Sequence, residues 1–147
     1  MEAILFIGIQ AVGKSSFYVE RFYQSHLRIN LDMLKTRHRE ALIFQACLEA
    51  KQPLVIDNTN PTALDRQRYL EPARKAGFRC VGYYFSSRVE DALARNRGRP
   101  EEQQVPAAAI FGAAGKLQRP ALEEGFDELF YVELDSPRGF LVKEWQP

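Results

Sequence analysis

The residues with the clearest chemical signal lie near the N-terminus, in the run Gly8-Ile9-Gln10-Ala11-Val12-Gly13-Lys14-Ser15. The run has the form G-x-x-x-x-G-K-[ST], in which glycines let the backbone turn so that successive N–H groups converge on phosphate oxygens. It continues the apolar residues 3–9 and precedes residues 16–23, which have helical character. The positive end of that helix would back the turn. The spacing therefore predicts a phosphate-binding loop between a strand and a helix.

Lys14 and Ser15 define the ligand that we expect in this loop. The lysine adds a point charge for the β and γ phosphates, and the Ser15 hydroxyl is suited to Mg²⁺, which proteins usually hold with few groups of their own. We therefore expect a nucleoside triphosphate, ATP, together with Mg²⁺. The residues expected to contact the nucleotide are Gly8, Gln10, Ala11, Val12, Gly13, Lys14, Ser15 and Ser16.

A second candidate is the carboxylate of Asp32, in Asn30-Leu31-Asp32 at the carboxyl end of the apolar residues 27–29. Ligands of open parallel sheets bind beyond the carboxyl ends of the strands. Asp32 would then accept the proton of a substrate hydroxyl as that hydroxyl attacks the γ-phosphate. The alternative is that Asn30 or Asp32 only caps the next helix.

A third apolar run, residues 54–56, ends in four polar side chains, which are Asp57, Asn58, Thr59 and Asn60. An aspartate at such a strand end commonly supports the magnesium or its water shell, so Asp57 joins Ser15 as a candidate metal residue. The other three are expected on the substrate side of the site. Asn60 also precedes Pro61, a pattern typical of a helix N-terminus.

Residues 96–106 are nearly free of apolar side chains and are expected to form an exposed, mobile lid. Arg97 and Arg99 lie in it, directly after Arg95. Arginines on a loop are usually a solvated surface. Phosphoryl transfer, however, develops negative charge on the γ-phosphate and gains from cations that arrive as a site closes. We expect Arg97 or Arg99 to fill this role.

Two further groups of basic residues follow the polar strand ends, Lys35, Arg37 and Arg39 after Asp32, and Arg66 and Arg68 after Asn60. If both groups line the site, its acceptor side is cationic, as a phosphate-bearing acceptor such as a nucleic acid requires. Charges two and four positions apart do not share one helix face, so at least one residue of each group should face water.

The elements that must position these residues can be inferred from short apolar runs rich in Ile, Val, Tyr and Phe. These predict strands over residues 3–9, 27–29, 54–56, 80–85 and 129–134. Helical segments lie between them, one over residues 33–51, one from Asn60-Pro61 to a stop near Gly77, and one opened by a capping box at Ser87–Glu90. Residues 140–142 form either a further strand or packing for the tail.

This alternation predicts an α/β fold, a three-layer P-loop NTPase or kinase fold with a parallel sheet of about five strands, helices on both faces and the arginine-bearing lid. The 147 residues suit a single domain, and the net charge of +1 requires no polyanionic partner. Only two cysteines occur, and no apolar run approaches a membrane span. We therefore expect a soluble protein of the cytoplasm.

Taken together, these residues resemble the P-loop polynucleotide 5′-hydroxyl kinases, including the kinase domain of polynucleotide kinase-phosphatases. The resemblance covers roughly residues 2–134 and rests on residues 8–15, Asn30-Leu31-Asp32, Val55–Pro61 with Arg66, Tyr69 and residues 73–77, Arg95-Asn96-Arg97 with Val105-Pro106, and Pro120–Phe126. It implies that Asp32 is the general base for the 5′-hydroxyl and that Arg97 or Arg99 contacts the transferring phosphate. It also implies that Lys35 helps to hold the nucleic-acid phosphate, where the phage member has an arginine; lysine keeps the charge but not the bidentate grip.

We therefore expect ATP-dependent phosphorylation of the 5′-hydroxyl end of DNA or RNA, with Asn58, Thr59, Asn60 and Arg66 on the acceptor side with Lys35. One alternative is a kinase of a sugar, antibiotic or nucleoside hydroxyl, which would not need the two arginine-rich segments. Another is a nucleotide-binding regulatory module, which would lack the general base or the lid arginine.

Overall fold

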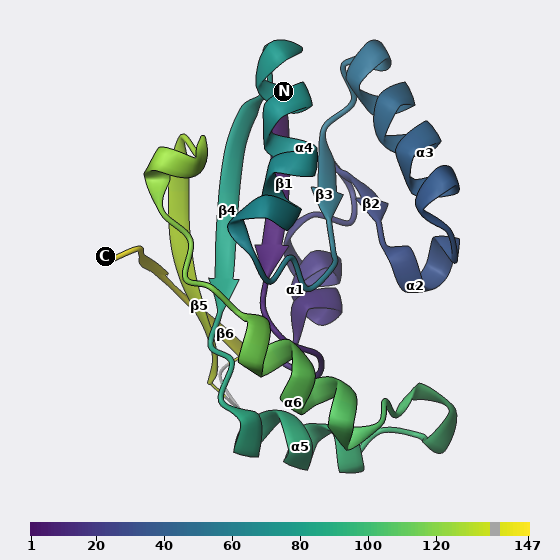
Figure 1. Ribbon diagram of the computed structural model, residues 1–147, viewed down its shortest axis with the longest axis vertical. Coiled ribbons are helices and arrows are strands. Elements are labelled where there is room, and N and C mark those ends of the chain that lie inside the picture. Colours follow the sequence, from purple (N-terminus) through teal and green to yellow (C-terminus); the bar gives the residue numbers. More distant parts are fainter. Residues whose placement is uncertain (136–138) are drawn as a thin grey trace.

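The computed structural model describes residues 1–135 and 139–147 and contains a six-stranded sheet (Figure 1). Its strands are β1 (Glu2–Ile7), β2 (Leu27–Ile29), β3 (Leu54–Ile56), β4 (Arg79–Phe85), β5 (Glu128–Asp135) and β6 (Gly139–Glu144). The order is β2-β3-β1-β4-β5-β6, with β1 to β5 parallel and β6 antiparallel to β5. The predicted α/β class and the five parallel strands are confirmed. Residues 140–142 belong to a sixth strand.

The order of the strands places a ligand-binding edge at the end of β1. From β1 the chain runs to β2 and β3 on one side, and later to β4 and β5 on the other. The register aligns the ends of β2 and β3 by pairing Ile29 with Ile56, and it pairs Ile56 with Leu5, two residues before the end of β1. Such a change of direction is where open α/β sheets bind ligands.

Helices cover both faces of the sheet. They are α1 (Lys14–Arg21), α2 (Leu31–Leu34), α3 (Arg37–Ala50), α4 (Ala63–Lys75), α5 (Val89–Arg97) and α6 (Ala107–Lys116), with 3₁₀ turns η1 (Glu101–Gln103) and η2 (Leu122–Glu124). Alternate residues of β1 point to opposite faces. Leu5 therefore joins a core with α3 and α4, and Phe6 joins one with α1, α5 and α6. Figure 1 shows α5 and α6 beyond the carboxyl ends of the strands.

The predicted single helix over residues 33–51 is wrong, because the chain forms α2 and α3 instead. Lys35 has φ +76° and breaks the helix, and the Thr36 side chain then caps α3 by accepting a hydrogen bond from the Arg39 N–H. The threonine offers the backbone a cap that competes with a continuous helix.

Two predicted helix starts are also displaced. Asn60 has φ +46° and donates its amide to the carbonyl of Phe6, while α4 begins after Thr62, which forms a capping box with Asp65. Ser87 does not cap α5, since its hydroxyl donates to the Phe85 carbonyl. At Asn60 this tertiary contact replaces the local cap, whereas the Ser87 hydroxyl bonds to a residue two positions before it and also accepts from the Ile9 N–H at 3.3 Å. The predicted stop of α4 is confirmed, because Gly77 follows the helix with φ +83°.

The expected lid segment is only partly a loop. Asn96 and Arg97 belong to α5, and residues 98–106 run from its end through η1 to α6. Asn96 joins the two ends, since its amide donates to the Val105 carbonyl at 2.7 Å and its oxygen accepts from the Val105 N–H at 3.0 Å. Among the described helices, none has the length and hydropathy needed to cross a bilayer.

Candidate functional site

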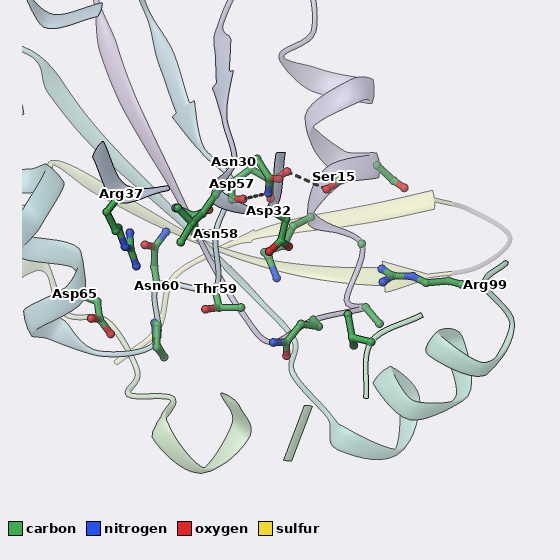
Figure 2. Close-up of a pocket in the computed structure, with 18 of the residues that line it drawn as sticks. Ser15, Asn30, Asp32, Arg37, Asp57, Asn58, Thr59, Asn60, Asp65 and Arg99 are labelled. Carbon is green, nitrogen blue, oxygen red and sulfur yellow. Dashed lines mark hydrogen bonds between the residues drawn. The ribbon is translucent and has the colours of Figure 1, made fainter. Parts of the chain in front are cut away.

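A cavity of about 390 Å³ lies at the carboxyl ends of β1, β2 and β3 (Figure 2). The phosphate loop bounds it on one side, and the start of α4 bounds it on another. The predicted site residues that line it are Gln10, Ala11, Gly13, Lys14, Ser15, Ser16, Asp32, Asp57, Asn58, Thr59, Asn60 and Arg99. The predicted site residues outside its lining are Gly8, Val12, Lys35, Arg66 and Arg97.

Contacts outside the cavity fix the conformation of the phosphate loop. Gly13 has φ +95°, and a Cβ there would lie 2.9 Å from the ring of Phe140, so both the backbone and the space require glycine. The Gly8 N–H donates to the Thr59 carbonyl at 3.0 Å, and Val12 is buried in the core. Gly8 and Val12 therefore hold the loop in place and do not offer side chains to a ligand.

Lys14 lies folded onto its own loop. Its ammonium donates to the carbonyls of Gly8 at 2.9 Å and Ile9 at 2.6 Å. Desolvation by burial, together with the smaller effect of the Arg99 cation, lowers the pKa of Lys14 to about 8 against the opposing effect of the Asp57 carboxylate. A phosphate would replace these carbonyls with full negative charge, which favours the protonated lysine.

The donor set for a divalent cation is small but chemically suited to Mg²⁺. The Ser15 hydroxyl donates to Asp57 Oδ2 at 2.9 Å, and the Asp57 carboxylate is buried. Within residues 1–135 and 139–147 no three His, Cys, Asp or Glu side chains cluster to hold a metal. Mg²⁺ usually keeps waters and substrate phosphates around one or two protein oxygens, so Ser15 and Asp57 fit it. The guanidinium of Arg28 already contacts the same two oxygens.

Asp32 lines the cavity while its neighbour does the capping. Asn30 accepts from the Met33 N–H at 2.9 Å to cap α2 and donates to the Asp57 carbonyl at 2.6 Å. Asp32 is exposed in the first turn of α2 and makes no side-chain hydrogen bond or ion pair with the described residues (Figure 2). Its charge also acts to raise the pKa of Lys14. Asp32 can therefore receive a proton from a group in the cavity.

A buried network positions the wall opposite the loop. Glu40 is 2% exposed and accepts hydrogen bonds from Tyr69 at 2.8 Å, Arg37 at 2.9 Å and Asn58 at 2.9 Å. The Asn58 oxygen in turn accepts from the Leu31 N–H at 2.8 Å. The network therefore links the end of β3 to the helix that carries Asp32 and directs Arg37 along the cavity wall.

A groove between α3 and α4 continues from this wall. It encloses about 400 Å³, and apolar atoms of Ala41, Phe44 and Pro72 contribute to it. Arg37 and Arg68 line both this groove and the cavity. Two cations thus lie where the cavity opens into a partly apolar groove.

The structure places Arg66 in the core and Lys35 at the surface, and neither residue lines the cavity. The Arg66 guanidinium is fully buried, donates to Glu124 at 2.8 Å and 3.3 Å, and donates to the carbonyls of Asn60 and Gln118. Lys35 is exposed at the end of α2 and lies outside the lining. Arg37 and Arg68 are the basic residues that line the cavity from these two segments.

The two lid arginines also differ in position. Arg99 lines the cavity and is close enough to Lys14 to lower the pKa of that ammonium (Figure 2). Arg97 is exposed at the end of α5 and lies outside the lining. Of the two arginines that the sequence left open, Arg99 has the position from which to reach a phosphate.

Sequence reasoning did not find Arg28 or Glu40. The signal for Glu40 is its helical phase, because Phe44, Cys47 and Leu48 follow it at buried positions of the same stripe. The signal for Arg28 is a single charge inside an apolar strand. Neither signal reveals the partner, which comes from another strand or helix.

Comparison with known proteins is consistent with this geometry. The chain is 30% identical over 131 residues to a "Bifunctional polynucleotide phosphatase/kinase" of Schizosaccharomyces pombe, an alignment that covers 85% of this chain and 32% of that protein. The chain thus spans about a third of the length of this relative.

Solved structures show the same fold. A gluconokinase from Sinorhizobium meliloti 1021 superimposes with a TM-score of 0.67 at 16% identity, over 92% of this chain and 84% of that one. Kti12 from Chaetomium thermophilum, in complex with ADP-AlF3, superimposes with a TM-score of 0.68 at 17% identity, over 90% and 89%. Both structures therefore share the α/β fold of this chain. The family model of the AAA domain AAA_33 matches residues 31–120, more than half of the chain, and the chain therefore belongs to that family.

Proposed function

We propose that this chain is an ATP- and Mg²⁺-dependent kinase that phosphorylates the 5′-hydroxyl end of a polynucleotide. The observation that carries the proposal is that one cavity brings together Lys14, Ser15, Asp57, Asp32 and Arg99. Lys14 is a cation suited to phosphate, and Ser15 and Asp57 offer oxygens that suit Mg²⁺. Asp32 is a carboxylate with no other partner among the described residues, and Arg99 is an arginine of the lid. A regulatory module would have no use for the last two.

The geometry supports in-line transfer from ATP. The N–H groups of the loop residues that line the cavity, and the Lys14 ammonium, would bind the β and γ phosphates. Ser15 and Asp57 would hold Mg²⁺, which when bound neutralises charge on the β and γ oxygens. Asp32 would accept the proton of the acceptor hydroxyl as its oxygen bonds to the γ-phosphorus, while the bond to the β–γ bridging oxygen breaks and ADP leaves. Arg99 would neutralise the charge that builds on the transferred group.

The acceptor class is inferred from charge, shape and a relative. Arg37 and Arg68 line both the cavity and the partly apolar groove between α3 and α4, and they would bind a phosphate next to the reacting nucleotide. A free sugar carries no such phosphate. The name of the Schizosaccharomyces pombe relative points to the same substrate class. Asn58, Thr59 and Asn60 would line the path of the acceptor.

Phosphorylation of short oligonucleotides tests the proposal. The protein is incubated with [γ-³²P]ATP, Mg²⁺ and DNA or RNA that ends in a 5′-hydroxyl, with 5′-phosphorylated versions as matched controls. We expect label on the 5′-hydroxyl strands only, loss of label with Lys14→Ala, and a steep rise of the oligonucleotide KM with salt. Labelling of gluconate or a nucleoside in the absence of any oligonucleotide product would instead establish a small-molecule kinase.

A further inference from the structure

Arg28 forms a closed ring with the two residues of the candidate metal site. Its Nε donates to Asp57 Oδ2 at 2.8 Å, and its Nη2 donates to Ser15 Oγ at 2.9 Å. Ser15 Oγ donates in turn to the same Asp57 oxygen at 2.9 Å. A guanidinium thus lies on the hydroxyl and the carboxylate that would hold Mg²⁺.

When no metal is bound, the positive charge of Arg28 compensates the negative charge of the buried Asp57 carboxylate. The Asp57 side chain is 2% exposed, and a buried carboxylate without a cation is costly. Arg28 lies in the middle of β2, and its side chain is 27% exposed. Its guanidinium is planar, which suits hydrogen bonds to two neighbouring oxygens.

The same contacts oppose a metal ion. A serine hydroxyl has one proton to donate and two lone pairs. In Ser15 the proton goes to Asp57 and one lone pair accepts from Arg28. A divalent cation on these oxygens would stand within a few ångströms of the guanidinium, and like charges at that distance repel strongly in a poorly solvated site.

We propose that Arg28 competes with Mg²⁺ for Ser15 and Asp57, so that the metal binds only when the guanidinium swings away from them. The side chain has a route outward, because it is partly exposed while its partner is not. The phosphates of the nucleotide would add the negative charge that tips the balance, so that metal and nucleotide load together. The inference rests on the proposed use of Mg²⁺–ATP.

Substitutions of Arg28 show whether this residue competes with Mg²⁺ or supports Mg²⁺ binding. Arg28→Met removes the cation and keeps most of the aliphatic side chain, and Arg28→Lys keeps the charge without the two hydrogen bonds of the guanidinium. Arg21→Gln is the control, because it removes an exposed arginine that pairs with Glu20 on α1. Each protein is titrated with Mg²⁺ in the presence of a fluorescent, non-hydrolysable ATP analogue and no acceptor. We expect the half-saturating Mg²⁺ concentration to fall about tenfold in Arg28→Met, less in Arg28→Lys, and not in Arg21→Gln.

Thermal unfolding supplies the second readout. Without metal, Arg28→Met leaves Asp57 without its cation, so its unfolding midpoint should lie below that of the wild type. Mg²⁺ and the analogue together should close much of that difference, because they stabilise this variant more than the wild type. A higher Mg²⁺ requirement in Arg28→Met would mean that Arg28 supports the metal site, and an unchanged requirement would mean that it is irrelevant to it. Either result overturns the inference.

The outcomes also separate this inference from the proposed function. Mg²⁺-dependent analogue binding by the wild type, with no shift in the variant, defeats the competition alone. Analogue binding that ignores Mg²⁺ in the wild type defeats the metal chemistry of the proposed function. Failure to phosphorylate a 5′-hydroxyl leaves the inference standing, because no acceptor is present in these titrations.

Discussion

Replacing Arg66 by methionine tests how the structure revises the acceptor side of the site. The Arg66 side chain is fully buried, and its guanidinium donates to both carboxylate oxygens of Glu124 and to three backbone carbonyls. Methionine fills much of the same volume but leaves Glu124, whose side chain is 12% exposed, without its cation. Breaking a buried pair from one side costs about 3–5 kcal/mol. That is a large part of the roughly 5–15 kcal/mol that stabilises a folded domain.

Thermal unfolding measures this loss directly. One kcal/mol shifts the midpoint of a domain of this size by about 2–4 °C, so Arg66→Met should unfold roughly 6–20 °C below the wild type. At a temperature where the variant is folded, its KM for an oligonucleotide should match that of the wild type. A variant that melts like the wild type but needs far more oligonucleotide would refute the reasoning and return Arg66 to the acceptor path.

Arg68→Met is the matched control, because it changes the same residue type on the same helix. Arg68 is exposed and lines the cavity. We expect its unfolding free energy to change by less than about 0.5 kcal/mol, as for most surface substitutions. Its oligonucleotide KM should rise, since it loses a phosphate contact. Arg66→Met should therefore lower stability without changing the oligonucleotide KM, and Arg68→Met should raise that KM without changing stability.

Three further predictions concern the reacting groups. Asp32→Asn should lower the single-turnover transfer rate by about 10²–10⁴-fold with unchanged binding of an ATP analogue, and a rate near that of the wild type would remove Asp32 as the base. Arg99→Ala should lower the same rate by about 10³-fold, and Arg97→Ala should have little effect; the reverse ranking would move the lid contact to Arg97. Because the pKa of Lys14 is lowered to about 8, the ammonium is lost as the pH rises above that value. Analogue affinity, measured by fluorescence at pH 7 and pH 9, should fall at the higher pH, and Lys14→Ala should lack this dependence.

Much of the fold could be predicted because its strands are read from local pattern. The continuous apolar runs at residues 54–56 and 80–85 reflect strands buried on both faces, and each lies in the predicted place. The phosphate loop could be found because its chemistry depends on types at fixed spacing. Helix starts were harder, because Asn60 and Ser87 have local capping chemistry, but the Asn60 amide donates to the distant Phe6 carbonyl and the Ser87 hydroxyl accepts from the distant Ile9 N–H.

The acceptor side was harder to predict because a charged side chain is expected at the surface even when it is buried in the fold. Arg66, Tyr69, Leu70 and Ala73 lie on one buried stripe of α4, and the spacing alone could have shown that Arg66 faces the core. Its charge argued for the surface instead, since the partner Glu124 lies far along the chain. For Arg28, a strand of three residues has too little period to show which way a side chain points.

The last strand has a mechanical consequence for the nucleotide loop. The ring of Phe140, at the start of β6, packs against Gly13 like a wedge, so closely that no Cβ would fit between them. A shortened version that stops before residue 139 would keep every residue of the phosphate motif yet lose this wedge. A change at residue 140 would therefore act on the loop from outside the cavity, because Phe140 is not among the residues that line it.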